Sequence, residues 1–256
     1  MKLSLKEIEK LSISIRKEIV AMITKANSGH CAGPLGAVEL YVSLYFGGVL
    51  KYDSQKPNLE NRDRVVISNG HYAPLIYSVL AHAGYFPLEK LKTLRKLGSQ
   101  LQGHSYRLSL PGIETSSGPV GEGLSQAVGM ALGAKLDKKK YQIYCFMGDG
   151  EQDCGNTWEA VMTANKYQLD NLTAIIDRNN IQIDGHNISE IIKALNSSKS
   201  IFVKPVVIIA HTIPGKGIDF MQWEHEWHGR VPDSQQAEEA LHQLRNLKGK
   251  IESELE

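Results

Sequence analysis

The residues best suited to chemistry lie in the stretch GDGEQDCGNTWEA, which begins at Gly148 and follows the apolar run YQIYCFM. The glycines mark the point where a strand ends and a helix begins, and Asp149 stands between two residues without side chains. A carboxylate at that point could meet a metal ion or a phosphate, or it could cap the following helix. The motif alone leaves both interpretations open, because Gly-Asp-Gly is common by chance.

A second polar residue follows one βαβ unit later. The segment NLTAIIDRNNIQIDG contains Asn179, and adjacent strand ends could bring Asn179 close to Asp149. Carboxylate, amide and backbone carbonyl oxygens are ligands that suit Mg²⁺ or Ca²⁺. A helix beginning near Asn156 would direct its unpaired amides to the same place, which favours a diphosphate. A strand-terminal Gly-Asp-Gly followed by Asn about 30 residues later resembles the known signature of thiamine diphosphate sites.

The whole chain has the composition of a globular protein. It has 256 residues, of which 42% are apolar and 22% charged, and a formal net charge of +1. No basic stripe interleaved with aromatic residues is present, so we expect no nucleic-acid partner. The longest apolar run outside the N-terminal region is VVIIA from Val206, so we expect no signal peptide and no membrane span. Three cysteines without Cys-x-x-Cys spacing favour a cytoplasmic protein with neither disulfides nor a zinc site.

Continuous apolar runs alternate with helical patterns along the chain, which is typical of a mostly parallel sheet with helices on both faces. We therefore predict a single α/β domain over residues 1–256. The pattern predicts strands at 64–68, 141–147, 171–177 and 204–212, loops at 27–36 and 97–123, and helices at the N-terminus, from 37, over 73–83, over 124–136 and over about 233–256. Ligands bind such sheets beyond the carboxyl ends of the strands, where this chain carries SNGH, MGDG, DRNN and AHT.

The polar motifs at these strand ends carry a resemblance to a known family. From Ser28 to His228 the chain resembles the N-terminal, diphosphate-binding half of transketolase, especially the split form in which the two halves are separate chains. The segments that carry the resemblance are ANSGH, YFGGVLKYD, NRDRVVISNGH, LQGH, SSGPVGEGLSQAVGMALGAKL, GDGEQDCGNTWEA, KYQLDNLTAIIDRNNIQIDG, AHTIPGKG and EWHG. The implied fold is the thiamine diphosphate-binding fold.

The resemblance implies roles for individual residues. The implied cofactors are thiamine diphosphate and Mg²⁺ or Ca²⁺, and the implied metal ligands are Asp149, Asn179 and the backbone carbonyl of Ile181. The implied catalytic residues, which would face the donor sugar and its proton transfers, are His30, His104 and His228. Imidazole suits this work because its ordinary pKa lies near neutrality. The implied cofactor-binding residues are His71, Gly118, Pro119, Val120, Gly148, Gly150, Asn179 and His228.

Three other histidines have no such motif around them. We interpret His82, His186 and His242 as structural or exposed. His211 lies at the end of a predicted strand, but the resemblance gives more weight to His228.

Three departures from the family pattern stand out. Cys154 takes a position where the family commonly has a glutamate that links the two cofactors across the interface between protomers, and a thiol does not supply that carboxylate. Cys31 and Ser105 each follow Gly-His where proline is usual, which should alter loop stiffness more than chemistry. A segment of roughly 30 residues is absent at Gly185–His186, so we expect a missing strand and either an open sheet edge or a space filled by a partner.

The chain also lacks any stretch that resembles the family's pyrimidine-binding domain, whose glutamate activates the cofactor. We therefore expect a transketolase subunit of the pentose phosphate pathway that moves a two-carbon ketol unit from a ketose phosphate to an aldose phosphate. The expected partner is the C-terminal subunit, in a heterotetramer built on a homodimer of this chain. The isolated chain should be inactive.

Two alternatives stay open. The chain could belong to another thiamine-dependent enzyme, of the deoxyxylulose-phosphate synthase or the 2-oxo acid decarboxylase or dehydrogenase type. The histidines expected to face a sugar argue against a 2-oxo acid substrate. The chain could also be a noncatalytic orphan half.

Overall fold

A five-stranded parallel sheet forms the centre of the molecule in the computed structural model, which describes residues 2–178 and 183–253. In spatial order the strands are β1 (Arg64–Ile67), β2 (Ile143–Gly148), β3 (Leu172–Arg178), β5 (Val206–His211) and β4 (Ile183–Asp184). In the register of the sheet, Gly148 at the end of β2 is opposite Asp177 near the end of β3. The predicted α/β class and the four predicted strands are confirmed.

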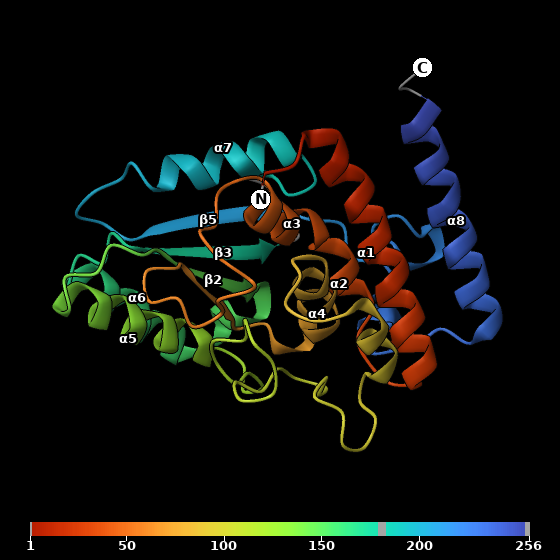
Figure 1. The fold of residues 1–256 in the computed structure, drawn as a ribbon, viewed down its shortest axis with the longest axis horizontal. Coiled ribbons are helices and arrows are strands. Elements are labelled where there is room, and N and C mark those ends of the chain that lie inside the picture. Colours follow the sequence, from red (N-terminus) through yellow and green to blue (C-terminus); the bar gives the residue numbers. More distant parts are fainter. Residues whose placement is uncertain (1, 179–182, 254–256) are drawn as a thin grey trace.

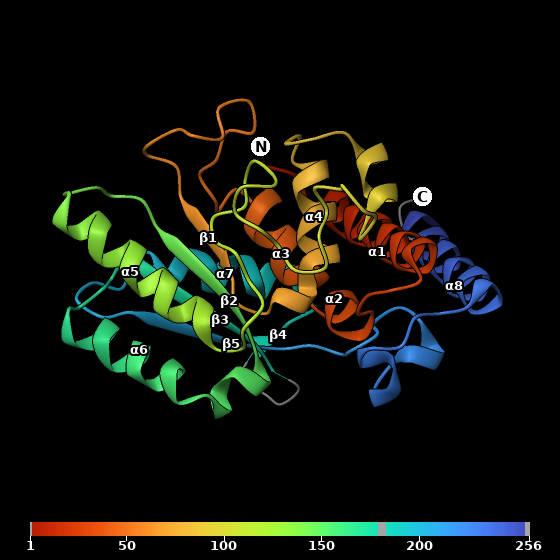
Figure 2. The same cartoon turned by 90° about the horizontal axis from the view of Figure 1, so that it is seen from below.

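Helices cover both faces of the sheet, because successive side chains of a strand point to opposite faces and all six residues of β2 are buried. On β2, Cys145 and Met147 belong to the core under α5 (Glu122–Leu136) and α6 (Gly155–Lys166), which pack against each other. Tyr144 and Phe146 belong to the core on the opposite face. Helices α3 (Val38–Phe46) and α7 (Ile188–Ser198) lie on that second face, as Figures 1 and 2 show. The Tyr41 ring of α3 stacks on Phe146 at 3.9 Å.

A second group of helices extends the core beyond the sheet. Helix α1 (Leu5–Ala26) begins at a capping box formed by Ser4 and Glu7, and it packs against α3, α4 (Ala73–His82) and α8 (Ser234–Ser253). Figure 1 shows α8 beside α1, at the end of the molecule away from α5 and α6. No helix in residues 2–178 and 183–253 is long and apolar enough to cross a membrane.

One predicted loop is wrong in part. Residues 27–36, expected to be a loop, contain the short helix α2 (Ala32–Gly36). Gly33 and Pro34 give this segment poor helix propensity, but four of its five residues are buried and a Cβ at Gly33 would come within 2.4 Å of the Tyr72 ring. Tertiary packing therefore overrides local preference. The other connections include the 3₁₀ turns Gly70–Tyr72, Leu88–Thr93, Asp149–Asp153, Asp219–Met221 and His225–His228.

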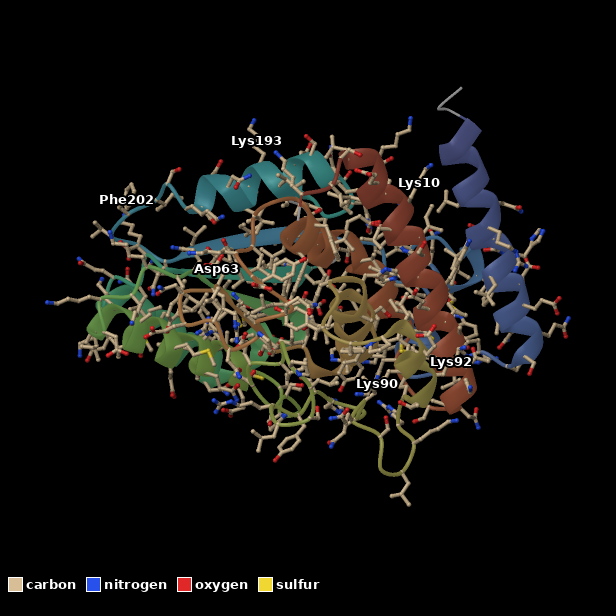
Figure 3. All side chains as sticks on the ribbon, in the orientation of Figure 1. Lys10, Asp63, Lys90, Lys92, Lys193 and Phe202 are labelled. Atoms are coloured by element: carbon tan, nitrogen blue, oxygen red, sulfur yellow. The ribbon has the colours of Figure 1, made fainter. Side chains whose placement is uncertain are left out.

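Buried side chains also hold the connecting segments in place. The carboxylate of Asp63, labelled in Figure 3, accepts hydrogen bonds from the backbone amides of Lys51 at 2.8 Å and Gln142 at 2.9 Å. These bonds fix the segments that enter β1 and β2.

The edge of the sheet beside β5 matches the expectation of a missing strand. Strand β4, which the sequence did not predict, has two residues and pairs only with Ala210 and His211. Within the described ranges, Val206–Ile209 pair with β3 on one side and with no strand on the other. Val207 is 51% exposed, and Phe202 in the preceding loop is 74% exposed at the end of the molecule away from α8, as Figure 3 shows.

Candidate active site

A cavity of about 740 Å³ opens at the carboxyl ends of the strands. Helix α2, the turns after β1 and β2, the end of β3 and the segment after β5 all contribute to its wall. Its lining residues are His30, Ala32, Gly33, His71, Tyr72, His104, Gly118, Val120, Gly148, Asp149, Gly150, Glu151, Asp177, Thr212, Pro214, Trp223, Glu224, His225 and His228. The position agrees with the edge at which ligands bind open α/β sheets.

Four of the five histidines that line this cavity, His30, His71, His104 and His228, come from four different segments and lie close together. The ring of His30 lies 5.4 Å from that of His71, 6.4 Å from that of His104 and 5.5 Å from that of His228, measured between centroids. The rings of His71 and His228 are 5.2 Å apart. A glycine at position 70 permits this approach, because a Cβ there would come within 2.8 Å of the His104 ring and of Ser117. All four histidines selected from the sequence therefore share one site.

The surroundings of His30, His71 and His104 lower the pKa of each imidazole and favour its neutral form. Burial, and then the neighbouring His228, lower the pKa of His30 to about 4. Burial is also the largest cause for His71, whose pKa falls to about 3. Burial and the guanidinium of Arg95 lower the pKa of His104. A general base must be unprotonated at neutral pH, and a neutral imidazole meets this condition because it can accept a proton.

The Gly-Asp-Gly turn places a carboxylate at the cavity wall. Strand β2 ends at Gly148, a 3₁₀ turn follows, and α6 begins at Gly155. The exposed Asp149 carboxylate accepts a 2.9 Å hydrogen bond from the backbone amide of Gly150. A Cβ at Gly150 would meet no atom within 4 Å, so open space lies beside the turn. Asn179 and Ile181, the other expected metal ligands, lie outside the described residues.

Glu151, which lines the cavity, connects three segments of its wall, a role that the sequence did not suggest. Its side chain is 97% buried, and its oxygens accept hydrogen bonds from the backbone amides of Gly148 at 2.7 Å and Gly121 at 3.1 Å and from the Ser68 hydroxyl. These partners come from the turn after β2, the loop before α5 and the turn after β1. Three donors on one buried carboxylate hold these segments together.

A second buried carboxylate borders the cavity. Asp177, near the end of β3, accepts a 2.6 Å hydrogen bond from the Tyr72 hydroxyl and another from the Thr212 hydroxyl. Burial raises its pKa to about 6. Its position inside an apolar strand could have marked it in the sequence, because carboxylates are rarely fully buried without a partner.

The segment Trp223–His225 forms another part of the wall that sequence reasoning missed. Trp223 has a φ of +64° and is 60% exposed, and its backbone amide donates to the Pro214 carbonyl at 3.2 Å. The sequence offered one indication of a role for Trp223, since this residue lies three positions before the EWHG motif.

The other residues considered from the sequence take different positions. His82 pairs with Glu18 at 2.9 Å, His242 is exposed on α8, and neither lines the cavity, as expected. His186 is structural, since its Nδ1 lies 3.0 Å from Glu39 and its Nε2 accepts from the Ile213 amide at 2.7 Å. His211 ends β5 and does not line the cavity.

The loop around Gly118 is fixed to the His104 loop by serine. The Ser105 hydroxyl lies 2.9 Å from that of Ser117, and the Ser117 amide donates to the Ser105 carbonyl at 2.9 Å. Gly118 and Val120 line the cavity, and the exposed Pro119 lies between them. The serine that replaces the usual proline thus supplies a link between two loops of the site.

The two unusual cysteines have different surroundings. Cys31 is buried at the start of α2, and burial raises its pKa to about 12. Cys154 is half-buried at the start of α6. A Cβ added at Gly121 would come within 2.8 Å of the Cβ of Cys154. Gly121 has a φ of +84°, so this position favours glycine on both counts.

The site holds unpaired polar atoms that a polar cofactor could contact. Among the described side chains, the buried His30 Nδ1 and Asn69 Nδ2 have no hydrogen-bond partner. No group of three or more His, Cys, Asp or Glu residues poised for a metal occurs in the described ranges. A metal held at Asp149 would therefore need amide, carbonyl and diphosphate oxygens, the hard ligands that Mg²⁺ and Ca²⁺ accept.

The sheet and the polar turns at its carboxyl edge define an α/β domain of the class that binds diphosphate cofactors. Residues 8–189 match the family model described as "Transketolase, thiamine diphosphate binding domain". The chain belongs to the transketolase family, and the resemblance drawn from its motifs is confirmed.

Relatives and solved structures agree with this assignment. The chain is 37% identical to an apulose-4-phosphate transketolase subunit of Phocaeicola vulgatus, over 93% of this chain and 94% of that protein. It is 38% identical to a 6-deoxy-6-sulfo-D-fructose transketolase subunit of Clostridium sp. (strain MSTE9), over 81% of this chain and 85% of that protein. The crystal structure of Campylobacter jejuni transketolase superimposes with a TM-score of 0.83 at 29% identity and covers 99% of this chain.

The lengths of these proteins carry further information. The chain spans 49% of the solved Campylobacter jejuni chain, whereas it spans most of the relatives named as subunits. The alignment with the Phocaeicola vulgatus protein has 266 positions, and 93% of 256 residues is about 238, so about 28 positions have no residue in this chain. This number agrees in size with the segment expected to be absent near Gly185–His186.

Proposed function

We propose that this chain is the diphosphate-binding subunit of a thiamine diphosphate-dependent transketolase. It would act in the transfer of a two-carbon ketol unit from a ketose phosphate to an aldose phosphate. The observation that carries the proposal is the meeting of His30, His71, His104 and His228 beside Asp149 in one cavity. The two relatives are named for a phosphorylated and a sulfonated sugar, which favours ketoses with an anionic end group as the substrate class.

The metal proposed for this site is Mg²⁺ or Ca²⁺. Asp149, Asn179 and the carbonyl of Ile181 would hold it, together with oxygens of the diphosphate. The amides at the start of α6 and the open space beside Gly150 favour binding of the diphosphate at the same turn. When bound, thiamine diphosphate supplies the carbon that carries the two-carbon unit between the sugars.

The histidines have separate proposed tasks. His71 and His228 would contact the diphosphate, while His30, His104 and His228 would face the sugar and exchange protons with its hydroxyls. Burial lowers the pKa of His30 and of His104, so both imidazoles are neutral at pH 7 and able to accept a proton. The backbone of Gly118, Pro119 and Val120 would lie against the aminopyrimidine ring.

The missing half of the site would come from a partner chain. We propose a C-terminal subunit with the pyrimidine-binding domain, in a heterotetramer that contains two copies of this chain. The relatives named as subunits support a partner. A cytoplasmic setting and a place in the pentose phosphate pathway remain parts of the same proposal.

The test is turnover of a ketose phosphate with a ribose-5-phosphate-type acceptor by this chain, by a cognate C-terminal chain and by their mixture. We expect activity only in the mixture, because relatives that this chain spans almost completely are named as subunits. Robust activity of this chain alone, free of host transketolase, would overturn the half-enzyme proposal. A mixture that binds the cofactor and transfers no ketol unit would favour another thiamine-dependent reaction or a noncatalytic role.

A further inference from the structure

Arg95 connects the two loops that carry His30 and His104. Its Nη1 donates a 2.7 Å hydrogen bond to the Ser28 hydroxyl, two residues before His30. Its Nη2 donates a longer bond of 3.4 Å to the carbonyl of Gly103, the residue before His104. One planar guanidinium therefore contacts both histidine motifs, although they are more than 70 residues apart in the sequence.

The residues around Arg95 leave space for its side chain. A Cβ at Gly103 would come within 3.0 Å of the Arg95 guanidinium, so the Gly-His motif leaves room for it. Arg95 has a φ of +56°, a conformation that costs a residue other than glycine about 1 kcal/mol. The hydrogen bond from its backbone amide to the Leu101 carbonyl, at 2.8 Å, holds the conformation. The side-chain bonds then offset its cost.

The charge of Arg95 acts on the site without a nearby carboxylate. No ion pair of Arg95 occurs among the described residues, and its buried Nε has no hydrogen-bond partner there. The uncompensated charge disfavours a second positive charge on the imidazoles of His30 and His104. Besides burial, the groups that lower the pKa of His30 are His228, Arg95 and His104, all of them basic. The carboxylates that line the same cavity belong to Asp149, Glu151, Asp177 and Glu224.

We propose that Arg95 is a positioning residue whose guanidinium fixes the loops of His30 and His104 relative to each other and sets the electrostatic surroundings of both imidazoles. The inference rests on the proposed function, in which these two histidines exchange protons with the sugar. Arg95 itself does not line the cavity. It acts through the residues on either side of it.

Two substitutions separate geometry from charge. Arg95→Met removes the positive charge and the two hydrogen bonds of the guanidinium. Arg95→Lys keeps the charge but loses the planar group that reaches two acceptors. Arg107→Met is the matched control, since Arg107 is exposed in the same long connection between η2 (Leu88–Thr93) and α5 and does not line the cavity. The first readout is an NMR titration of the imidazoles in the full chain alone, assigned with His30→Gln and His104→Gln.

In Arg95→Met, the titration midpoints of His30 and His104 should move to higher pH, with a smaller change at His71, whose surroundings do not include Arg95. In Arg95→Lys, the two midpoints should stay low. The second readout is turnover by the assembled enzyme, which should fall about 10- to 100-fold in both variants because the histidines are no longer held in place. Arg107→Met should match the wild type in both readouts.

Unchanged midpoints for His30 and His104 in a folded Arg95→Met chain would overturn the inference. Turnover of Arg95→Lys within twofold of the wild type would overturn its geometric part, even if Arg95→Met failed to fold. The NMR readout needs neither partner nor substrate. It therefore decides the role of Arg95 even if the assembled protein proves to have a different activity.

Discussion

The guanidinium of Arg16 on α1 donates to both carboxylate oxygens of Glu39 on α3, at 2.6 and 2.7 Å. Both side chains are more than 90% buried. His186, just after β4, adds its Nδ1 at 3.0 Å from the same carboxylate. The network joins two helices to the turn after the two-residue edge strand β4, so it stabilises this edge of the sheet.

Glu39→Gln should lower the free energy of unfolding by about 3 kcal/mol or more, because it leaves the Arg16 charge buried without a counter-ion. Urea denaturation at pH 7 measures the loss. Glu226→Gln is the control, since Glu226 pairs with Arg230 on the surface and should contribute less than about 1 kcal/mol. Equal losses in the two variants would contradict this account of the buried pair.

The Glu39 pair should also show in the pH dependence of stability. Burial alone would raise the pKa of Glu39, but Arg16 and His186 lower it by more, to about 2. A carboxyl group with a depressed pKa stabilises the fold above its unfolded pKa and loses that contribution as the pH falls. The stability difference between wild type and Glu39→Gln should therefore shrink between about pH 4.5 and pH 2. A difference that stays constant over this range would refute the prediction.

Glu151→Gln should weaken both the fold and cofactor binding. A single amide oxygen cannot accept from Gly148, Gly121 and Ser68 as the two carboxylate oxygens do. We expect a loss of about 1–3 kcal/mol in unfolding free energy and about tenfold weaker binding of thiamine diphosphate. Calorimetry on the assembled protein measures the affinity, with the exposed Glu89→Gln as control. A stability loss with unchanged affinity would mean that Glu151 does not position the site.

Asp149→Ala should weaken thiamine diphosphate binding by about 100-fold or more, since changes to outer-shell residues alone often cost 10- to 100-fold. Removing divalent ions with a chelator should have a similar effect on the wild type and add little in the variant. Isothermal calorimetry on the assembled protein tests both statements. Asp153→Ala, an exposed change in the same 3₁₀ turn, should bind normally. Unchanged affinity of folded Asp149→Ala would exclude a metal at this turn.

His104→Ala and His228→Ala should each reduce ketol transfer by about 100-fold or more, through lost proton transfer or lost hydrogen bonds to the sugar. His82→Ala should stay near wild-type turnover, because His82 pairs with Glu18 away from the cavity. Steady-state kinetics of the assembled enzyme make the comparison. Similar losses at all three positions would indicate general destabilisation.

The sequence alone determined most of the local structure and the class of site. Periodicity located the helix at 73–83 and the strand at 171–177 to within a residue or so, because apolar alternation and turn residues act over short distances. The Gly-Asp-Gly turn was located for the same reason. Periodicity failed at α2, where glycine and proline oppose a helix that packing supports, and at β4, where two residues are too few to leave a pattern.

Only the tertiary structure brought the functional groups together. Motifs could select His30 and His104, but no local rule places their rings 6.4 Å apart or sets Arg95 between their loops. Partners such as Tyr72 and Asp177 come from distant segments, so their hydrogen bond exists only after the sheet has formed. Burial then lowered the pKa of His30 and raised that of Asp177, since desolvation depends on what the whole fold excludes from water.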